Sequence, residues 1–393
     1  MNWWILEDAL RDRKGHWLEY LRTFRSGLED TGDSLRIFAS RECEPDVAAA
    51  LGAEPVLPRS IWARMGDAAP KWKRFLRVFT HGWATYTTVL RILSRKQKAE
   101  SGKHKTTSPN LQSPTILFVP TVLVHHLLGW YFLLAGKLRR AKTRVVLFFP
   151  NTPAYLDDDG TPRWNPDPTA KLFAFLIRRL AKWVRQGQLI LGAETEPMVR
   201  AMTQLTGVPF LYLPHPVQPL GARSQTRHSN DTMIRFGAYG SARYEKGSEL
   251  IQEAIRLYLE NQPDSRARFS LQWIHDYPLP DGKMVRLDPV LVTHPQCEII
   301  NEHFPEGGYE AQIAQTDVVI LPYREAYRLR VSRVVIEAMQ AGIPTIVAKG
   351  TTLHQQAAEH GTLIECEQNN PQSILAAIRY AIANIDPLRA AAA

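Results

Sequence analysis

Residues 317–348 read DVVILPYREAYRLRVSRVVIEAMQAGIPTIVA. An apolar run at Val318–Leu321 precedes a loop, an amphipathic stretch follows from Ser332, and a Gly-Ile-Pro break leads into a second apolar run. This order predicts strand, helix and strand in a parallel sheet. Such sheets bind ligands at the carboxyl ends of their strands, where the next helix offers free N–H groups to a phosphate. Glu337, one to two turns into this helix, is placed to accept hydrogen bonds from sugar hydroxyls.

The same alternation of apolar and amphipathic stretches extends along the whole chain. We expect strands at residues 3–6, 35–39, 116–119, 145–149, 189–191, 210–213, 234–238, 269–275, 290–292, 318–321, 345–348 and 362–364. We expect helices at residues 17–31, 70–93, 122–138, 171–185, 197–205, 248–260, 309–314, 332–340, 352–359 and 371–385. This pattern predicts an α/β fold of two Rossmann-like domains, each a doubly wound parallel sheet, facing each other across a cleft.

The proline-rich and polar segment Pro214–Asp231 is typical of a linker between domains. We therefore expect one domain at residues 1–215 and a second at 216–383, with residues 384–393 packing back on the first. A chain of 393 residues with 45% hydrophobic and 22% charged residues suits two folded domains. Three widely spaced cysteines and an amino terminus without a signal-peptide pattern favour a cytoplasmic protein.

Two segments bear on membranes. Residues 116–135 are long enough to span a bilayer, but Pro120 and the pair His125-His126 favour a buried strand followed by a buried helix with packed histidines. Between Lys71 and Lys105, aromatic and apolar residues recur at helical spacing among basic ones. This stretch is either a core helix with a solvated basic edge or a surface for anionic lipid on the inner face of a membrane. Nothing in it indicates a nucleic-acid-binding module.

A glycine-containing turn follows the expected strand at residues 234–238. It reads FGAYGSARYEKG, and its glycines permit a tight turn while Lys246 stands near the start of the next helix. An ammonium group there could neutralise a diphosphate, although a plain turn with a solvated lysine fits the same residues. The helix beginning near Ser332 lies about ninety residues later in the same domain, so the two loops together indicate a nucleotide site more strongly than either alone.

These motifs resemble the donor-binding domain of the GT-B-fold retaining glycosyltransferases. The resemblance rests on G-x5-K-G at Gly240–Gly247, D-x4-P at Asp317–Pro322 and S-x-V-x2-E-A-M-x2-G-x-P at Ser332–Pro344, and it covers Met233 to about Asp386. More weakly, Gly15-His16 is similar to the glycine-rich loop after the family's first strand.

By this resemblance, Lys246 binds the donor diphosphate, Glu337 the ribose hydroxyls, and the backbone at Ser332 and Arg333 the phosphate, while Gly15 lets the first loop close. The other residues that we expect at the donor are Gly240, Arg243 and Arg330. His16 is the candidate catalytic residue, and the alternative is a loop histidine that caps the helix from Trp17.

The sequence departs from the family pattern at several positions. Leu329 stands eight residues before Glu337, where the family has a first glutamate, and Arg333 stands where a glycine is usual. The run Asp157-Asp158-Asp159-Gly160 contains D-x-D, a metal motif of the other glycosyltransferase fold, but its composition favours an acidic surface turn. We therefore expect no metal and no cofactor, because lysine, arginines and the helix terminus supply the positive charge.

The sequence thus predicts a metal-independent retaining glycosyltransferase, hexosyltransferase-like, that moves a sugar from a nucleotide-diphosphate sugar to a hydroxyl acceptor. Sugars and lipid-linked acceptors of polysaccharide or glycolipid synthesis are the acceptors we expect. Two alternatives remain open: a non-catalytic protein that binds nucleotide sugars, and a GT-B-type epimerase or phosphorylase.

Overall fold

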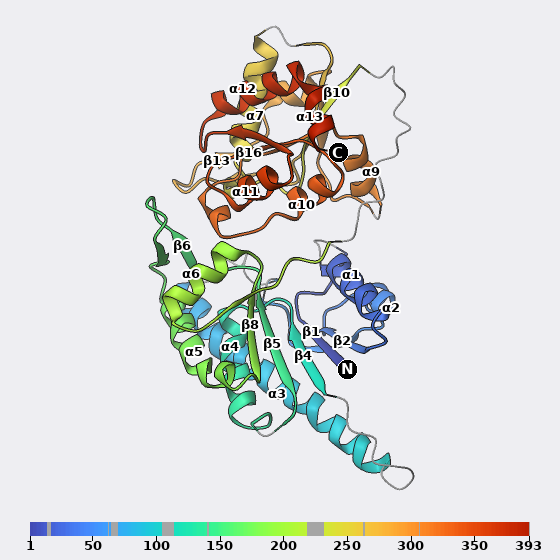
Figure 1. The fold of residues 1–393 in the computed structure, drawn as a ribbon, viewed down its shortest axis with the longest axis vertical. Helices are drawn as coiled ribbons and strands as arrows, with labels where there is room; N and C mark the ends of the chain where they lie inside the picture. Colours follow the sequence, from blue (N-terminus) through green and yellow to red (C-terminus); the bar gives the residue numbers. More distant parts are fainter. Residues whose placement is uncertain are drawn as a thin grey trace. The chain divides into compact units, whose positions relative to one another are not determined.

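The computed structural model describes residues 1–13, 17–61, 63, 70–103, 114–139, 141–217, 232–261, 264–305 and 307–392. The chain divides into two compact units, Met1–Pro216 and Val217–Ala393, drawn in Figure 1. Each unit is built around its own parallel sheet covered by helices, so the predicted α/β class is confirmed.

Within the described residues, the first unit holds a seven-stranded sheet in the order β3-β2-β1-β4-β5-β8-β9, with all neighbours parallel. Its strands are β1 (Asn2–Glu7), β2 (Ser34–Ser40), β3 (Glu54–Leu57), β4 (Thr115–Val119), β5 (Arg144–Phe149), β8 (Leu189–Ala193) and β9 (Leu211–Tyr212). Its helices are α1 (Trp17–Glu29), α2 (Pro45–Leu51), α3 (Lys71–Lys103), α4 (Val124–Ala135), α5 (Pro168–Arg185) and α6 (Glu196–Thr206). The strands β6 (Ala154–Leu156) and β7 (Pro162–Trp164) form a separate antiparallel hairpin.

The second unit holds a six-stranded sheet in the order β14-β11-β10-β15-β16-β17, again parallel throughout the described residues. Its strands are β10 (Ile234–Ala238), β11 (Ala267–Gln272), β14 (Cys297–Ile300), β15 (Val318–Leu321), β16 (Thr345–Ala348) and β17 (Leu363–Cys366); β12 (Tyr277–Pro278) and β13 (Met284–Val285) form a small hairpin. Its helices are α7 (Ser248–Glu260), α8 (Pro289–Thr293), α9 (Gly308–Gln315), α10 (Arg333–Gln340), α11 (Thr352–Glu359), α12 (Pro371–Ala383) and α13 (Ile385–Ala392), with short 3-10 turns η2 (Tyr244–Lys246) and η3 (Glu325–Arg328).

Local sequence sets several helix boundaries. Asp167, Thr195 and Asn370 accept hydrogen bonds from the first-turn N–H groups of α5, α6 and α12, and a proline follows each within the first two positions. Such residues satisfy N–H groups that have no partner within the helix, and proline lacks one that would be wasted there. The α6 helix ends at Gly207, whose φ of 70° is in the left-handed region that glycine adopts without strain.

One expected strand was wrong. Residues 290–292 form part of α8 and not a strand, because Asp288 accepts a hydrogen bond from the Val290 N–H and Pro289 begins the helix. Residues Ile385–Ala392 form α13, in which Ile385 and Leu388 pack in the core of the second unit and Arg389 pairs with Asp317 at 2.8 Å. Apolar burial beside a buried carboxylate thus holds α13 where it is. The packing of residues 384–393 on the first unit stays a prediction.

The segment that could be mistaken for a membrane span forms β4 and α4, as predicted. No helix in the part of the chain that the structure describes is long and apolar enough to cross a bilayer. Residues 218–231, most of the predicted linker, lie outside the described residues.

Candidate active site

Two loops of the second unit meet because their strands are neighbours. Strand β10 pairs in parallel with β15, so their carboxyl ends lie at the same edge of the sheet. The loop after β10 carries Gly240 and Lys246, and the loop after β15 leads through η3 to α10. The backbone N–H of Arg324 donates to the Glu245 carbonyl at 3.0 Å, which joins the two loops directly.

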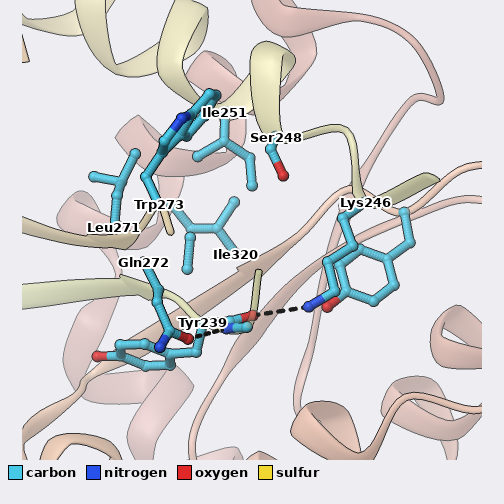
Figure 2. A pocket seen from close by; sticks show the side chains of 11 residues that line it. Tyr239, Lys246, Ser248, Ile251, Leu271, Gln272, Trp273 and Ile320 are labelled. Carbon is cyan, nitrogen blue, oxygen red and sulfur yellow. Dashed lines mark hydrogen bonds between the residues drawn. The ribbon is translucent and has the colours of Figure 1, made fainter. Parts of the chain in front are cut away.

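Lys246 points into the fold between these loops, as Figure 2 shows. Its Nζ donates to the Tyr239 carbonyl at 3.2 Å and lies 5.6 Å from the centre of the Tyr323 ring. Gly240 has φ +83°, and a Cβ built on it would lie 2.2 Å from Nζ. Gly240 is therefore needed both for the turn and for the position of the ammonium group. The Gln272 side chain accepts the Gly240 N–H at 2.6 Å and fixes the turn from β11.

Burial sets the charge state of this lysine. Desolvation, helped by the nearby Arg243 guanidinium, lowers the pKa of Lys246 to about 7. Near neutral pH the ligand-free chain therefore holds a mixture of ammonium and amine. An anion bound beside Nζ would favour the charged form, so this group is poised to respond to a phosphate.

Arg324 holds the two loops together, and the sequence analysis did not identify it. Its side chain is 5% exposed and donates to the Asn369 side chain, the Tyr244 carbonyl and the Glu249 carboxylate. Its guanidinium also lies 4.0 Å from the centre of the Tyr244 ring. A buried, fully paired arginine of this kind fixes the loop that carries Lys246. Its place directly after Pro322-Tyr323 is the sequence signal that could have identified it.

Tyr323 links the lysine to the start of α10. Burial and Tyr327 raise the pKa of Tyr323, whereas the Ser332 side chain and the charge of Arg243 lower it. Ser332 is the N-cap of α10, and its side chain makes no capping hydrogen bond there. The first N–H groups of α10 are thus not satisfied by the Ser332 side chain, as a phosphate site at a helix terminus requires.

Glu337 lies on α10 in a buried ion pair. It is 2% exposed, and the Nε of Arg333 donates to its Oε1 from one helical turn earlier. Burial raises the pKa of Glu337 and Arg333 opposes that shift. Tyr309 of α9 is adjacent, since burial and the Glu337 carboxylate both raise the pKa of Tyr309. Glu337 can therefore receive ribose hydroxyls only if it shares or leaves its contact with Arg333.

The other predicted residues are less informative. Arg243 is exposed, Arg330 is half-buried with its carbonyl bound by the Thr352 hydroxyl, and Leu329 is buried. Gly15 and His16 lie outside the described residues, so their roles stay predictions.

The cavity beside Lys246 is small. It has a volume of about 20 Å³, room for about one water, and is lined by residues of β10, β11, α7 and β15. A larger cavity, about 320 Å³, lies toward the amino ends of β10, β11 and β14, around Arg235, Arg268 and Glu298. Nucleotide-sized ligands need several hundred Å³. The prediction of an anion site at Lys246 rests on the charge of this lysine and the nearby helix terminus, and not on cavity size.

The D-x-D run forms the turn of the β6–β7 hairpin, as predicted. Asp157 and Asp159 both accept the Thr161 N–H at 2.8 Å, and Arg163 pairs with Asp157. The carboxylates are thus occupied by ordinary turn contacts.

A second polar cluster is buried in the first unit, and the sequence analysis missed it. Nε2 of His81 on α3 and Nε2 of His126 on α4 each lie 3.3 Å from Oδ2 of Asp8, which follows β1. These three residues could hold a metal ion by their spacing. Burial opposes ionisation, yet the two histidines lower the pKa of Asp8 below its usual range.

The hydrogen bonds of His126 argue against a metal at this cluster. Its Nδ1 accepts the Leu123 N–H at 3.0 Å, so the proton resides on Nε2 and is donated to Asp8. A histidine ligand instead donates from its second nitrogen and leaves the other free for the metal. The cluster therefore fits a hydrogen-bonded network that ties α3 and α4 to β1, and His126 is a packed histidine as predicted.

Solved structures match the whole chain. WaaG, a glycosyltransferase involved in lipopolysaccharide biosynthesis, is 14% identical with a TM-score of 0.60, over 100% of this chain and 93% of WaaG. The structure "Trehalose-6-phosphate from E. coli bound with UDP-2-fluoro glucose" is 12% identical with a TM-score of 0.62, over 100% and 94%.

This chain has the GT-B fold. A protein named as a UDP-N-acetylglucosamine 2-epimerase from Listeria monocytogenes shares it at 13% identity and a TM-score of 0.52, over 99% of this chain and 91% of that one. No protein-family model and no curated protein matches the sequence. The predicted GT-B resemblance is therefore confirmed at the level of the fold.

Proposed function

We propose that this GT-B protein is a glycosyltransferase that moves a sugar, most simply a hexose, from a nucleotide-diphosphate sugar to a hydroxyl acceptor. One arrangement carries the proposal: Lys246 and the start of α10 lie together at the carboxyl ends of the adjacent strands β10 and β15. A buried cation near a helix start whose N-cap side chain makes no capping hydrogen bond suits a diphosphate. The likeness to a protein bound with UDP-2-fluoro glucose supports this donor class.

In this proposal the second unit holds the donor and the first unit holds the acceptor. The bond between the anomeric carbon and the diphosphate breaks, and its electron pair leaves with the diphosphate. Lys246, the Arg243 guanidinium and the α10 N–H groups stabilise that developing charge, which is the task a metal performs elsewhere. The acceptor oxygen bonds to the anomeric carbon from the same face, and its proton passes to the departing phosphate oxygen, so configuration is retained. Acceptors of glycolipid or polysaccharide synthesis in the cytoplasm are the class we propose.

The test uses the purified full chain and a panel of nucleotide sugars. Thermal stabilisation selects the donor, because a bound ligand raises apparent stability by mass action. Release of nucleoside diphosphate is then measured with and without hydroxyl acceptors. Lys246→Ala should weaken donor binding by about 1–3 kcal/mol, the cost of a lost charge-assisted phosphate contact. Lys283→Ala, which removes an exposed lysine of the same unit, is the matched control. Equal donor binding by both variants would exclude Lys246 from the donor site.

A second candidate is a GT-B protein that binds nucleotide sugars without turnover. The buried Leu329 in place of a glutamate and the closed Arg333–Glu337 pair favour it. Donor binding without any release of sugar would support it. A third candidate is an epimerase, favoured by the likeness to a protein named as one. Product formed from the nucleotide sugar alone, without an acceptor, would identify epimerase activity.

A further inference from the structure

The helix α3 exposes a row of large apolar side chains, which we call the α3 stripe: Trp72, Phe75, Leu76, Phe79 and Trp83. Trp72 and Trp83 are 61% and 60% exposed, and Leu76 is 50% exposed. On a helix of 3.6 residues per turn these five positions fall within an arc of about 100° and span about 16 Å along the axis. Phe132 of α4 is 42% exposed, and the centre of its ring lies 6.0 Å from that of Tyr86 on α3, so it continues the exposed apolar surface onto α4.

The opposite face of α3 packs on α4, and the two helices lie side by side in Figure 1. A Cβ on Gly129 would lie 2.6 Å from the Gly82 carbonyl oxygen, so the two backbones approach as closely as glycine permits. His81 of the same turn reaches Asp8 in the buried cluster. The α3 stripe therefore faces outward because of rigid contacts on its far side, and a small rotation of the helix cannot hide it.

The charge of the helix is strongly positive. Residues 71–103 contain nine Lys or Arg residues and one Glu, a formal charge of +8 out of +9 for the whole chain. Lys73 lies beside the stripe, with its ammonium 5.4 Å from the centre of the Trp72 ring. Exposed aromatic rings beside basic residues of the same helix match an anionic lipid surface, where rings enter the headgroup layer and cations contact phosphates.

We propose that the α3 stripe docks on the surface of a bilayer containing anionic phospholipids. A second copy of the chain fits the stripe poorly, because it would bring another helix of charge +8 against the first. An apolar groove on a neutral partner would leave the basic flank without a counter-charge. This inference goes beyond the proposed transferase and does not depend on it, since docking needs neither donor nor turnover.

The test is flotation of the full chain with vesicles in a density gradient. Vesicles of phosphatidylcholine alone are compared with vesicles containing about 30 mol% phosphatidylglycerol, at about 50 mM and about 500 mM NaCl, since salt screens exposed charges. The protein should float with anionic vesicles at low salt, with at least about fivefold less bound at high salt or on neutral vesicles.

Two variants separate the apolar and charged contributions. Trp72→Ser/Trp83→Ser should lower the vesicle partition coefficient at least about tenfold, whereas Phe175→Ser/Tyr380→Ser, two equally exposed aromatics elsewhere, should leave it unchanged. Lys73→Glu/Arg77→Glu should also lower it about tenfold on anionic vesicles, and Arg286→Glu should not. Thermal melts confirm folding, and the charge variant serves as the test if the tryptophan variant is unstable.

Three results would overturn the proposal. One is wild-type protein that stays with the unbound fraction on anionic vesicles at low salt. Another is binding that both double variants retain in full. The third is a lipid-free dimer that becomes monomeric in Trp72→Ser/Trp83→Ser, since that result would assign the stripe to a second copy of the chain.

Discussion

Binding of a nucleotide-sugar donor should take up a proton, because Lys246 is only partly charged in the free chain. With a pKa of about 7, lowered first by burial and then by Arg243, about nine in ten of these lysines are protonated at pH 6 and about one in ten at pH 8. The diphosphate diester of a nucleotide sugar keeps its two charges over this range. Bound phosphate should restore the lysine to its charged form, so the ligand-free protein must gain the missing proton.

The magnitude follows from those fractions. Donor binding should take up about 0.1 proton at pH 6 and about 0.9 at pH 8, and the apparent affinity should fall about tenfold, or about 1.4 kcal/mol, between them. Isothermal titration calorimetry at pH 8 in buffers of different ionisation enthalpy measures the protons directly. Lys246→Arg is the matched control, since a guanidinium stays charged and should give no uptake. Wild-type binding without proton uptake at pH 8, or equal uptake by Lys246→Arg, would refute the reasoning.

Three further predictions follow from particular contacts. Gly240→Ala would place a Cβ 2.2 Å from the Lys246 Nζ, at a residue whose φ is +83°. We therefore expect donor affinity to fall about tenfold and the free energy of unfolding to fall by about 1 kcal/mol. Unchanged donor affinity by calorimetry would contradict this. In Gly129→Ala the new Cβ would lie 2.6 Å from the Gly82 carbonyl oxygen, so the free energy of unfolding in urea should fall by about 1–3 kcal/mol. Gly160→Ala is the control: no atom lies within 4 Å of its Cβ, and its φ of +81° should lower the free energy of unfolding by only about 1 kcal/mol. Burial, reinforced by Asp8, raises the pKa of Glu7 from 4.5 to about 8, so between these pH values the folded state holds a proton that the unfolded state has lost, and stability falls as pH rises. Glu7→Gln should remove this fall and be more stable than wild type by up to about 5 kcal/mol at pH 9. Parallel stability curves for the two proteins would show that Glu7 is ionised throughout.

Much of the fold could be predicted because each element carries its own local signal. The apolar runs that became β10, β15 and β16 are each followed within two residues by a glycine or proline, and α10 has a clear amphipathic pattern. The strand expected at residues 290–292 is wrong because Asp288-Pro289 starts a helix there, and this start signal is stronger than the run of three apolar residues. The edge strand β14 was missed because its four residues are only partly buried and alternate weakly.

The site was predictable in its residue types and less so in its contacts. The glycine turn, Lys246 and the start of α10 could be placed together because adjacent parallel strands share an edge. The i, i+4 spacing of Arg333 and Glu337 predicts an ion pair on one helix face. The sequence analysis noted the Arg333 side chain only as a replacement for the usual glycine. The network of Asp8, His81 and His126 joins residues from three distant parts of the chain, and no local pattern reports which faces of α3 and α4 point toward β1.

The central claim is that a diphosphate binds between the Lys246 loop and the start of α10. A crystal structure of the chain with the donor chosen by thermal stabilisation tests it most directly. We predict diphosphate oxygens within hydrogen-bond distance of the Lys246 Nζ and of the first N–H groups of α10, with Lys246 released from the Tyr239 carbonyl. A nucleotide bound instead in the cavity around Arg235 and Arg268, with Lys246 still on Tyr239, would contradict the account.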